Sequence, residues 1–174
     1  MRDIRKPLIA AWLSACMVAM ACPASAQGSD VGRLKAAIML NVLRFVTVPG
    51  NGDANRPLRL CVERTIAAAP DFQQLDGRQI GERPINVRVA ELASGAPGCD
   101  IAYVGARNAA EIARISQYGL LLVGDDSSFI NAGGAVGLVR FGNQIRFEIN
   151  AKAARQAGFV ISSKLMRLAA RVQL

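Results

Sequence analysis

Apolar residues recur at helical spacing near the start of the chain, and they predict a helix from about Asp30 to Val46. The stripe that this helix is expected to bury consists of Val31, Leu34, Ile38, Val42 and Phe45. Asn41 falls inside the same stripe. A buried asparagine needs hydrogen-bond partners, so Asn41 either holds a neighbouring loop in place or marks a contact with a ligand or partner. The sequence from Pro49 to Gly52 ends the helix.

The middle of the chain alternates apolar strands with helical segments. Strands are predicted at 58–62, 85–89, 100–104 and 120–123, and helices at 64–75 and 106–117. The order strand, helix, strand with short connections between 100 and 123 requires a parallel pair with a right-handed crossover. Apolar strands without alternation indicate a sheet that is covered on both faces.

The last third of the chain changes to an antiparallel pattern. Strands at 135–141 and 144–149 flank Gly142-Asn143, a two-residue hairpin turn. In that register Leu138 faces Phe147 on an apolar face, while Arg146 and Glu148 share the other face and are candidates for partner contact. Asn150 is expected to N-cap a helix over 151–157.

A final helix is expected from Ser162 or Ser163 onward, with a buried face formed by Leu165, Leu168, Ala169 and Val172. Taken together, these patterns predict an α/β fold. It is a layered sheet with a parallel β-α-β core and a C-terminal antiparallel hairpin, flanked by helices.

The first 26 residues have the pattern of a cleaved signal peptide. A basic start is followed by the apolar run 7–22, which is shorter than the roughly 20 residues that span a bilayer. Ala24-Ser25-Ala26 is a cleavage pattern, so residues 27–174 are expected to form a single exported domain. Cys16 follows a lipobox-like Leu13-Ser14-Ala15, which leaves lipidation at Cys16 as the less favoured alternative.

The cysteine and histidine content restricts the chemistry. The chain has no histidine, which excludes Ser-His-Asp and Cys-His mechanisms and removes the commonest transition-metal ligand. After removal of the signal, Cys61 and Cys99 remain as a pair in an oxidising compartment, where disulfides persist. A bridge and two free buried thiols both fit this pattern, and the bridge is favoured.

The charge of the chain does not indicate a nucleic-acid partner. The formal net charge is +8, but the basic residues are scattered singly and no aromatic spacing typical of a single-strand binder is present. A generic basic surface is the favoured interpretation.

Motifs of common enzymes are absent from the sequence, and no cofactor or metal is predicted. Asp125-Asp126 follows a predicted strand and could hold a hard cation, but a turn or helix cap is favoured. Gly133-Gly134 permits either a tight turn or a close approach of the backbone to a ligand, and the turn is favoured.

Two stretches carry a resemblance to a known family. The helix Lys35 to Val46 resembles the opening helix of the YfiR-like periplasmic family, and the run from Leu121 to Ala169 is similar to its closing half. That run contains Gly133-Gly134, the hairpin, Phe147-Glu148-Ile149-Asn150 and Ser162-Ser163-Lys164-Leu165. The resemblance places a structural disulfide at Cys61 and Cys99. The first helix departs from the family in having few aromatic residues.

The resemblance implies a periplasmic protein without catalytic residues. Such a protein represses a membrane-anchored diguanylate cyclase by binding its periplasmic part, and thereby lowers cyclic-di-GMP signalling. Candidate contact residues are Asn41, Gly133, Gly134, Arg146, Glu148 and Asn150. A homodimer is left open, and the alternative function is that of a periplasmic small-solute-binding domain.

Overall fold

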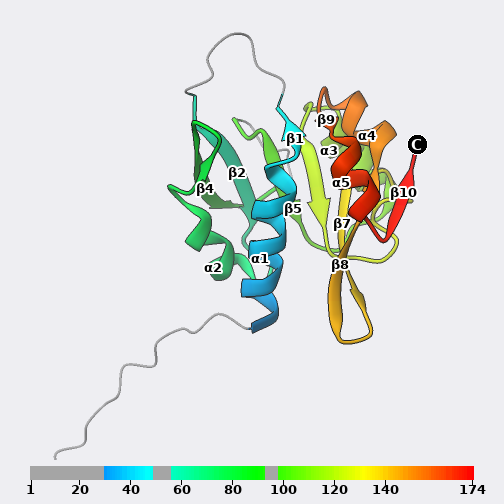
Figure 1. Ribbon diagram of the computed structural model, residues 1–174, viewed down its shortest axis with the longest axis horizontal. Coiled ribbons are helices and arrows are strands. Elements are labelled where there is room, and N and C mark those ends of the chain that lie inside the picture. The colour runs from blue at the N-terminus through cyan, green and yellow to red at the C-terminus, as the bar shows by residue number, and fades with distance from the viewer. Residues whose placement is uncertain (1–29, 49–55, 93–97) are drawn as a thin grey trace, which may run out of the picture.

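The centre of the molecule is an eight-stranded sheet (Figure 1). A computed structural model describes residues 30–48, 56–92 and 98–174, so the predicted signal peptide lies outside the described residues. The strands of this sheet, in the order β10-β8-β7-β6-β5-β2-β4-β3, are β10 (Arg171–Gln173), β8 (Gln144–Asn150), β7 (Val136–Phe141), β6 (Leu121–Gly124), β5 (Ile101–Val104), β2 (Leu58–Glu63), β4 (Arg83–Ala90) and β3 (Gln79–Ile80).

The five strands from β4 to β7 run parallel. All residues of β5 and β6 are buried, as their unbroken apolar sequences predict for a sheet covered on both faces. Helix α3 (Ala109–Ser116) connects β5 to β6. Its N-terminus is a capping box, in which Asn108 accepts from the Glu111 amide and Glu111 accepts from the Asn108 amide. The mixed α/β architecture confirms the predicted fold class.

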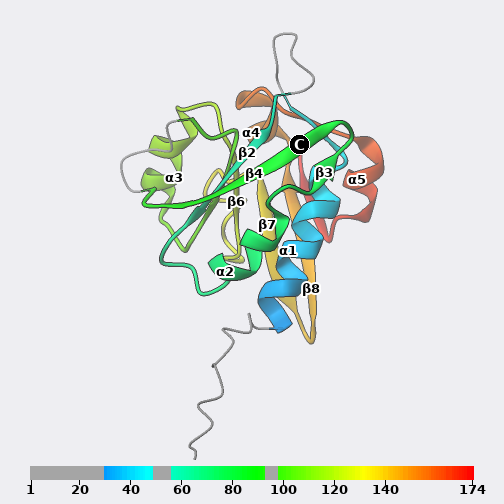
Figure 2. The ribbon, with the colours of Figure 1, turned by 90° about the vertical axis from the view of Figure 1, so that its left-hand side faces the viewer.

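Helices cover both faces of the sheet (Figures 1 and 2). Helix α3 packs on one face. The other helical elements contribute to the core cluster on the opposite face. They are α1 (Asp30–Leu43), α2 (Ala69–Phe72), the 3-10 turn η1 (Gln73–Leu75), α4 (Ala151–Gln156) and α5 (Ser163–Leu168). A separate two-stranded ladder joins β1 (Val46–Thr47) to β9 (Val160–Ile161).

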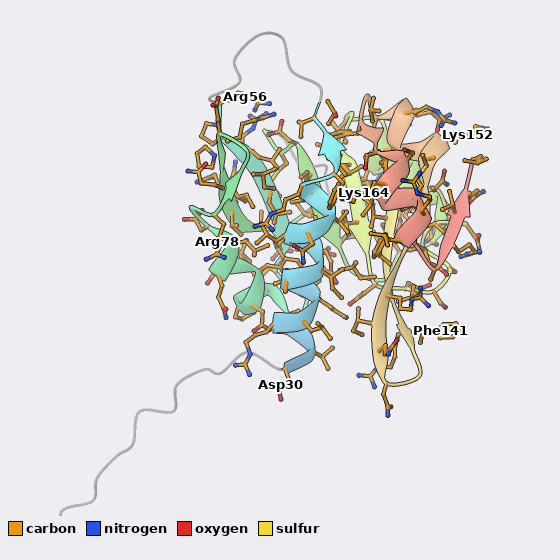
Figure 3. All side chains as sticks on the ribbon, in the orientation of Figure 1. Asp30, Arg56, Arg78, Phe141, Lys152 and Lys164 are labelled. Carbon is orange, nitrogen blue, oxygen red and sulfur yellow. A yellow bond between two sulfur atoms is a disulfide. The ribbon has the colours of Figure 1, made fainter. Side chains whose placement is uncertain are left out.

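The C-terminal hairpin has the predicted register. Leu138 pairs with Phe147 and Val136 with Ile149, and Phe141 pairs with Gln144 across the two-residue turn. Gly142 has a φ of 60°, which the first residue of this turn type requires. The end of the hairpin extends beyond the rest of the sheet (Figure 1), and Phe141 lies on this projecting part (Figure 3).

The buried face of the first helix differs from the prediction. The residues of α1 that are buried are Gly32, Ala36, Met39, Leu40, Val42 and Leu43. Val31, Leu34 and Asn41 are exposed. The helix carries apolar residues on two faces, and helical periodicity by itself does not tell which of them meets the sheet. Small residues at positions 32 and 36 let the backbone approach its neighbours closely, and they lie on the face that is buried.

Two other helices are shorter than predicted. The predicted helix over 64–75 is reduced to α2 and η1, because residues 64–68 form turns after β2. The final helix ends at Leu168, which is exposed, and residues 171–173 form β10. The Ala170 amide donates to the Phe147 carbonyl at 2.8 Å as the chain joins the edge of β8. Pairing with this open edge satisfies backbone groups that a longer helix would leave exposed.

The predicted disulfide is present between Cys61 on β2 and Cys99 just before β5, with a Cα–Cα distance of 5.9 Å. The next residue, Asp100, is buried and bound by two arginines. Arg56 Nη2 donates to Asp100 Oδ1 at 2.8 Å, and the Arg59 backbone amide donates to Oδ2 at 2.9 Å. The bridge and this ion-pair cluster together tie β2 to the start of β5.

The Asp100 carboxylate makes stability depend on pH. Burial alone would raise the pKa of Asp100, but hydrogen bonds from Arg59 and Arg56 outweigh it and lower the pKa to about 2. The folded-state pKa therefore lies below the unfolded value of roughly 3.9. The resulting stabilisation is complete above that unfolded value and is lost as the pH falls through about 2.

We expect Asp100→Asn to lower the free energy of unfolding by about 1–2 kcal/mol at pH 7, since both arginines are partly exposed to water. Urea titrations at several pH values should show the difference from wild type shrinking between about pH 4 and pH 2. Glu91→Gln is the control, because Glu91 forms an exposed ion pair with Arg64. A difference between Asp100→Asn and wild type that is independent of pH would contradict the prediction.

Candidate functional site

An open groove of about 240 Å³ lies between α1, β8 and α5. It forms because α1 packs on the sheet through its other face, and because α5 ends before it can cover the exposed part of β8. Its lining consists of Ile38, Asn41, Val42, Phe45, Ile145, Arg146, Phe147, Leu165 and Leu168. Most of these side chains are apolar, so the groove offers a surface from which a partner can displace water.

The apolar lining continues along α1 beyond the groove. Leu34 comes three residues after Val31, and Ile38 comes four residues after Leu34, so the three side chains share one helix face. Both are exposed, and so is Leu168 on α5. Contiguous exposed apolar surface of this kind is typical of binding sites. These three side chains and the groove are called the α1 face below.

The charged groups at and beside the groove are cationic. Arg146 lines the groove and is exposed. Lys164 on α5 places its Nζ 5.5 Å from the centre of the Phe45 ring, a cation–π arrangement, and its position beside α1 can be seen in Figure 3. Arg44 is exposed next to Phe45. Within the described residues, the lining contains no acidic side chain.

The structure brings together two of the predicted contact residues. Asn41 on α1 and Arg146 on β8 are far apart in the sequence, but both line the groove. The exposed Asn41 side chain is 3.4 Å from Arg44, with its Oδ1 accepting from Nη1. The expectation that Asn41 is buried is therefore wrong, because the helix face that carries it is turned away from the sheet.

Glu148 and Asn150 lie outside the groove. Glu148 accepts from Arg171 at 2.7 Å, and this ion pair joins β8 to β10. The Asn150 side chain caps α4 by accepting from the Ala153 amide at 2.9 Å, and its Nδ2 donates to the Ile130 carbonyl at 2.9 Å. The side chains of Glu148 and Asn150 therefore both stabilise the fold.

Gly133 and Gly134 also serve the fold. Gly133 has a φ of 106°, a backbone conformation that favours glycine. A Cβ on Gly134 would lie 2.0 Å from the Phe129 ring. The glycine pair therefore makes the turn that was favoured from the sequence, and it leaves room for a buried aromatic ring.

The aspartate pair after β6 also forms a turn. Asp126 Oδ1 accepts from the Ser128 hydroxyl and, at 2.7 Å, from the Ser128 amide. The hydroxyl first, and then the amide, lower the pKa of Asp126. Asp125 forms an ion pair with Lys35 of α1. Among the described residues, no group of three or more potential ligands is placed to hold a metal ion.

Sequence reasoning missed most of the apolar lining. The helical periodicity predicts Ile38 and Phe45 in a buried stripe, and Leu168 on the buried face of a longer helix. The signal that could have revealed the groove is Asn41 itself. A polar residue within an apolar stripe is easier to accommodate where that stripe faces a binding surface than where it faces a core.

The chain matches the model of DUF4154, described as YfiR/HmsC-like, over residues 32–170. The chain belongs to the YfiR/HmsC-like family. No functionally curated protein matches the sequence at a significant level. Within the described residues, no helix combines the length and the apolar character that crossing a membrane requires.

Two solved structures share the fold. One is a conserved domain protein from Vibrio cholerae O1 biovar eltor strain N16961, with 13% identity and a TM-score of 0.51, covering 82% of this chain. The other is an ABC domain in complex with L-Trp from Streptococcus pneumoniae, with 11% identity and a TM-score of 0.54, covering 79% of this chain. This chain spans 60% of the length of each. At such low identity the likeness concerns the fold alone.

Proposed function

We propose that this YfiR/HmsC-like protein is a periplasmic regulator that represses a membrane-anchored diguanylate cyclase and so lowers cyclic-di-GMP signalling. It acts by binding the periplasmic part of the cyclase, and the proposal assigns it no catalytic step. Family membership supports the regulatory role. The signal-peptide pattern of residues 1–26 supports export.

The observation that carries the proposal of a contact surface is the α1 face, an exposed apolar groove with cations beside it. The occupant that fits is an apolar segment of the cyclase whose flanks carry acidic side chains. Arg146, Lys164 and Arg44 would attract such flanks, while the groove buries the apolar residues. A second copy of this chain fits less well, because a symmetric contact through this face would bring the same cations together.

We expect Leu168→Arg to weaken binding of the cyclase's periplasmic part by about tenfold or more, because it places a charge in the apolar contact. Leu168 is 57% exposed, so the substitution should leave stability nearly unchanged. Tyr118→Arg is the matched control, since Tyr118 is 55% exposed and comes just after α3, the helix that packs on the opposite face of the sheet from α1 and α5. Affinity is measured with the purified periplasmic part of the cyclase.

The same variants test the function in cells. Deleting the gene should raise cyclic-di-GMP, and wild type or Tyr118→Arg should restore the lower level, whereas Leu168→Arg should not. An unchanged cyclic-di-GMP level after deletion would contradict the regulatory role. Full restoration by Leu168→Arg would contradict the α1 face as the contact surface.

A further inference from the structure

The groove of the α1 face follows an edge of the central sheet. Its lining includes three consecutive residues of β8, namely Ile145, Arg146 and Phe147. Successive side chains of a strand point to opposite faces of the sheet. A groove that touches all three residues therefore runs along the edge of the strand, where the backbone of β8 is within reach of a partner.

Only part of this edge carries a neighbouring strand. Strand β10 pairs with β8 at Glu148, Ile149 and Asn150, whereas β8 begins at Gln144. In the part of the chain that the structure describes, no strand pairs with residues 144–147 on the side away from β7. These four residues give an edge of about 13 Å at the usual rise per residue. An open edge of this kind is a template for pairing with another chain.

The hydrogen bonds of the hairpin show which backbone groups face this edge. The Asn150 amide donates to the Ala135 carbonyl at 2.8 Å. Opposite residues in an antiparallel ladder alternate between bonded and non-bonded pairs. The continuous register therefore gives every second residue from Asn150 back to Gln144 its bonds to β7. Ile145 and Phe147 lie between them, so their amides and carbonyls point away from β7.

Phe147 and Ile145 differ in how far these outward groups are used. The Phe147 carbonyl accepts from the Ala170 amide at 2.8 Å, which confirms the direction in which it points. The amide and the carbonyl of Ile145 have no hydrogen-bond partner among the described residues. Ile145 therefore offers one backbone donor and one backbone acceptor at the edge that the groove follows.

The side chains beside this edge determine what kind of strand would fit. Ile145, Phe147 and Leu168 provide apolar contacts in the groove. Arg146 alternates with the first two, so it projects on the other face of the sheet, and it is exposed. A strand that alternates apolar and acidic side chains matches both faces, since opposite charges on neighbouring strands attract. A helix would leave the backbone groups of Ile145 without partners.

We infer that the segment of the cyclase binds as an added β-strand on residues 144–147 of β8, with its apolar side chains in the groove and an acidic side chain beside Arg146. The inference rests on the proposed function and specifies the conformation of the partner. In this mode of recognition, backbone hydrogen bonds supply affinity and alternate side chains supply specificity.

The variant Ile145→Pro tests the backbone hydrogen bond. Proline lacks the amide hydrogen, and it is tolerated on edge strands where the N–H faces away from the ladder. Ile145→Ala is the matched control, because it shortens the side chain but keeps the amide. We expect Ile145→Pro to bind the purified periplasmic part of the cyclase at least about tenfold more weakly than Ile145→Ala, since it leaves a carbonyl of the partner unpaired. Equal affinities of the two variants would overturn the inference.

Hydrogen exchange in the wild-type mature protein, followed by NMR, is a second measurement that needs no variant. Without the cyclase part, the Ile145 amide should exchange rapidly, whereas the Arg146 amide, which is bonded to β7, should be protected. In the complex, exchange of the Ile145 amide should slow by at least about tenfold. Unchanged exchange of this amide in the complex would overturn the inference, even if Ile145→Pro does not fold.

The outcomes separate this inference from the proposed function. If Leu168→Arg weakens binding while Ile145→Pro matches Ile145→Ala, the cyclase occupies the α1 face in another conformation, such as a helix, and only the inference fails. If the wild-type protein does not bind the periplasmic part of the cyclase, the proposed function fails and the inference fails with it.

Discussion

Replacing Cys61 and Cys99 together by alanine should lower the free energy of unfolding by about 4 kcal/mol, as the chain-entropy model gives for a loop of this length. The bridge closes a sequence separation of 38 residues, which includes β3 and β4. Both cysteines are buried in the cluster on the α3 side of the sheet. Removing the bridge therefore frees a long segment of the unfolded chain and also removes sulfur atoms from a packed site.

Urea denaturation of the double variant measures this loss, and a thiol-labelling assay shows whether the bridge forms in the exported protein. Labelling of unreduced, denatured wild-type protein should detect no free thiol at Cys61 or Cys99. Reduction of wild type should reproduce most of the loss of stability seen in the double variant. A loss of less than about 1 kcal/mol in the free energy of unfolding would contradict the stabilisation that we predict from closing a loop of this length.

Gly134→Ala should lower the free energy of unfolding by about 3 kcal/mol, the upper range for overpacking a core. A Cβ at this position would lie 2.0 Å from Phe129 Cε1, and one on Gly124 would lie 2.6 Å from the same ring. The ring is thus held between two glycines. It is 1% exposed, so it cannot move outward without disturbing the core.

Gly137→Ala is the matched control for this prediction. Gly137 is buried on β7, but an added Cβ would meet Ile130 Cγ2 at 3.5 Å, an ordinary contact. Its cost should stay below about 1 kcal/mol. Combining Gly134→Ala with Phe129→Leu should cost less than the sum of the two single changes, because the clash is shared. Full additivity would show that the ring is not the cause.

The position of a candidate contact residue in the sequence did not by itself predict its role in the structure. Asn150 and Gly134 were candidates for contact, yet the structure engages Asn150 in a helix cap and Gly134 in packing against Phe129. Arg146 and Asn41 come from distant parts of the chain and meet at one groove. Which polar residues meet depends on how α1 is rotated on the sheet, and no local pattern encodes that rotation.

Features that rest on local chemistry could be predicted from the order of the amino acids. The hairpin register follows from Gly142-Asn143 and the alternation around it, and the β-α-β unit follows from apolar strands with short connections. The sequence favours the pairing of Cys61 with Cys99, because these two cysteines remain once the predicted signal peptide is set aside. The Leu121–Ala169 run indicates the family. Each of these features can be recognised from a short stretch of sequence or from the number of cysteines.

The buried face of α1 and the end of the last helix depend on contacts between distant segments, and they became known from the folded structure. Both faces of α1 carry apolar residues, and the small side chains at positions 32 and 36 allow the closer packing. Residues 171–173 form a strand because the backbone edge of β8 offers partners that are distant in sequence. Contacts between segments that are distant in the sequence leave no periodic pattern in either segment. Which face of α1 is buried, and that the α1 face stays exposed, is therefore set when the helix packs on the sheet.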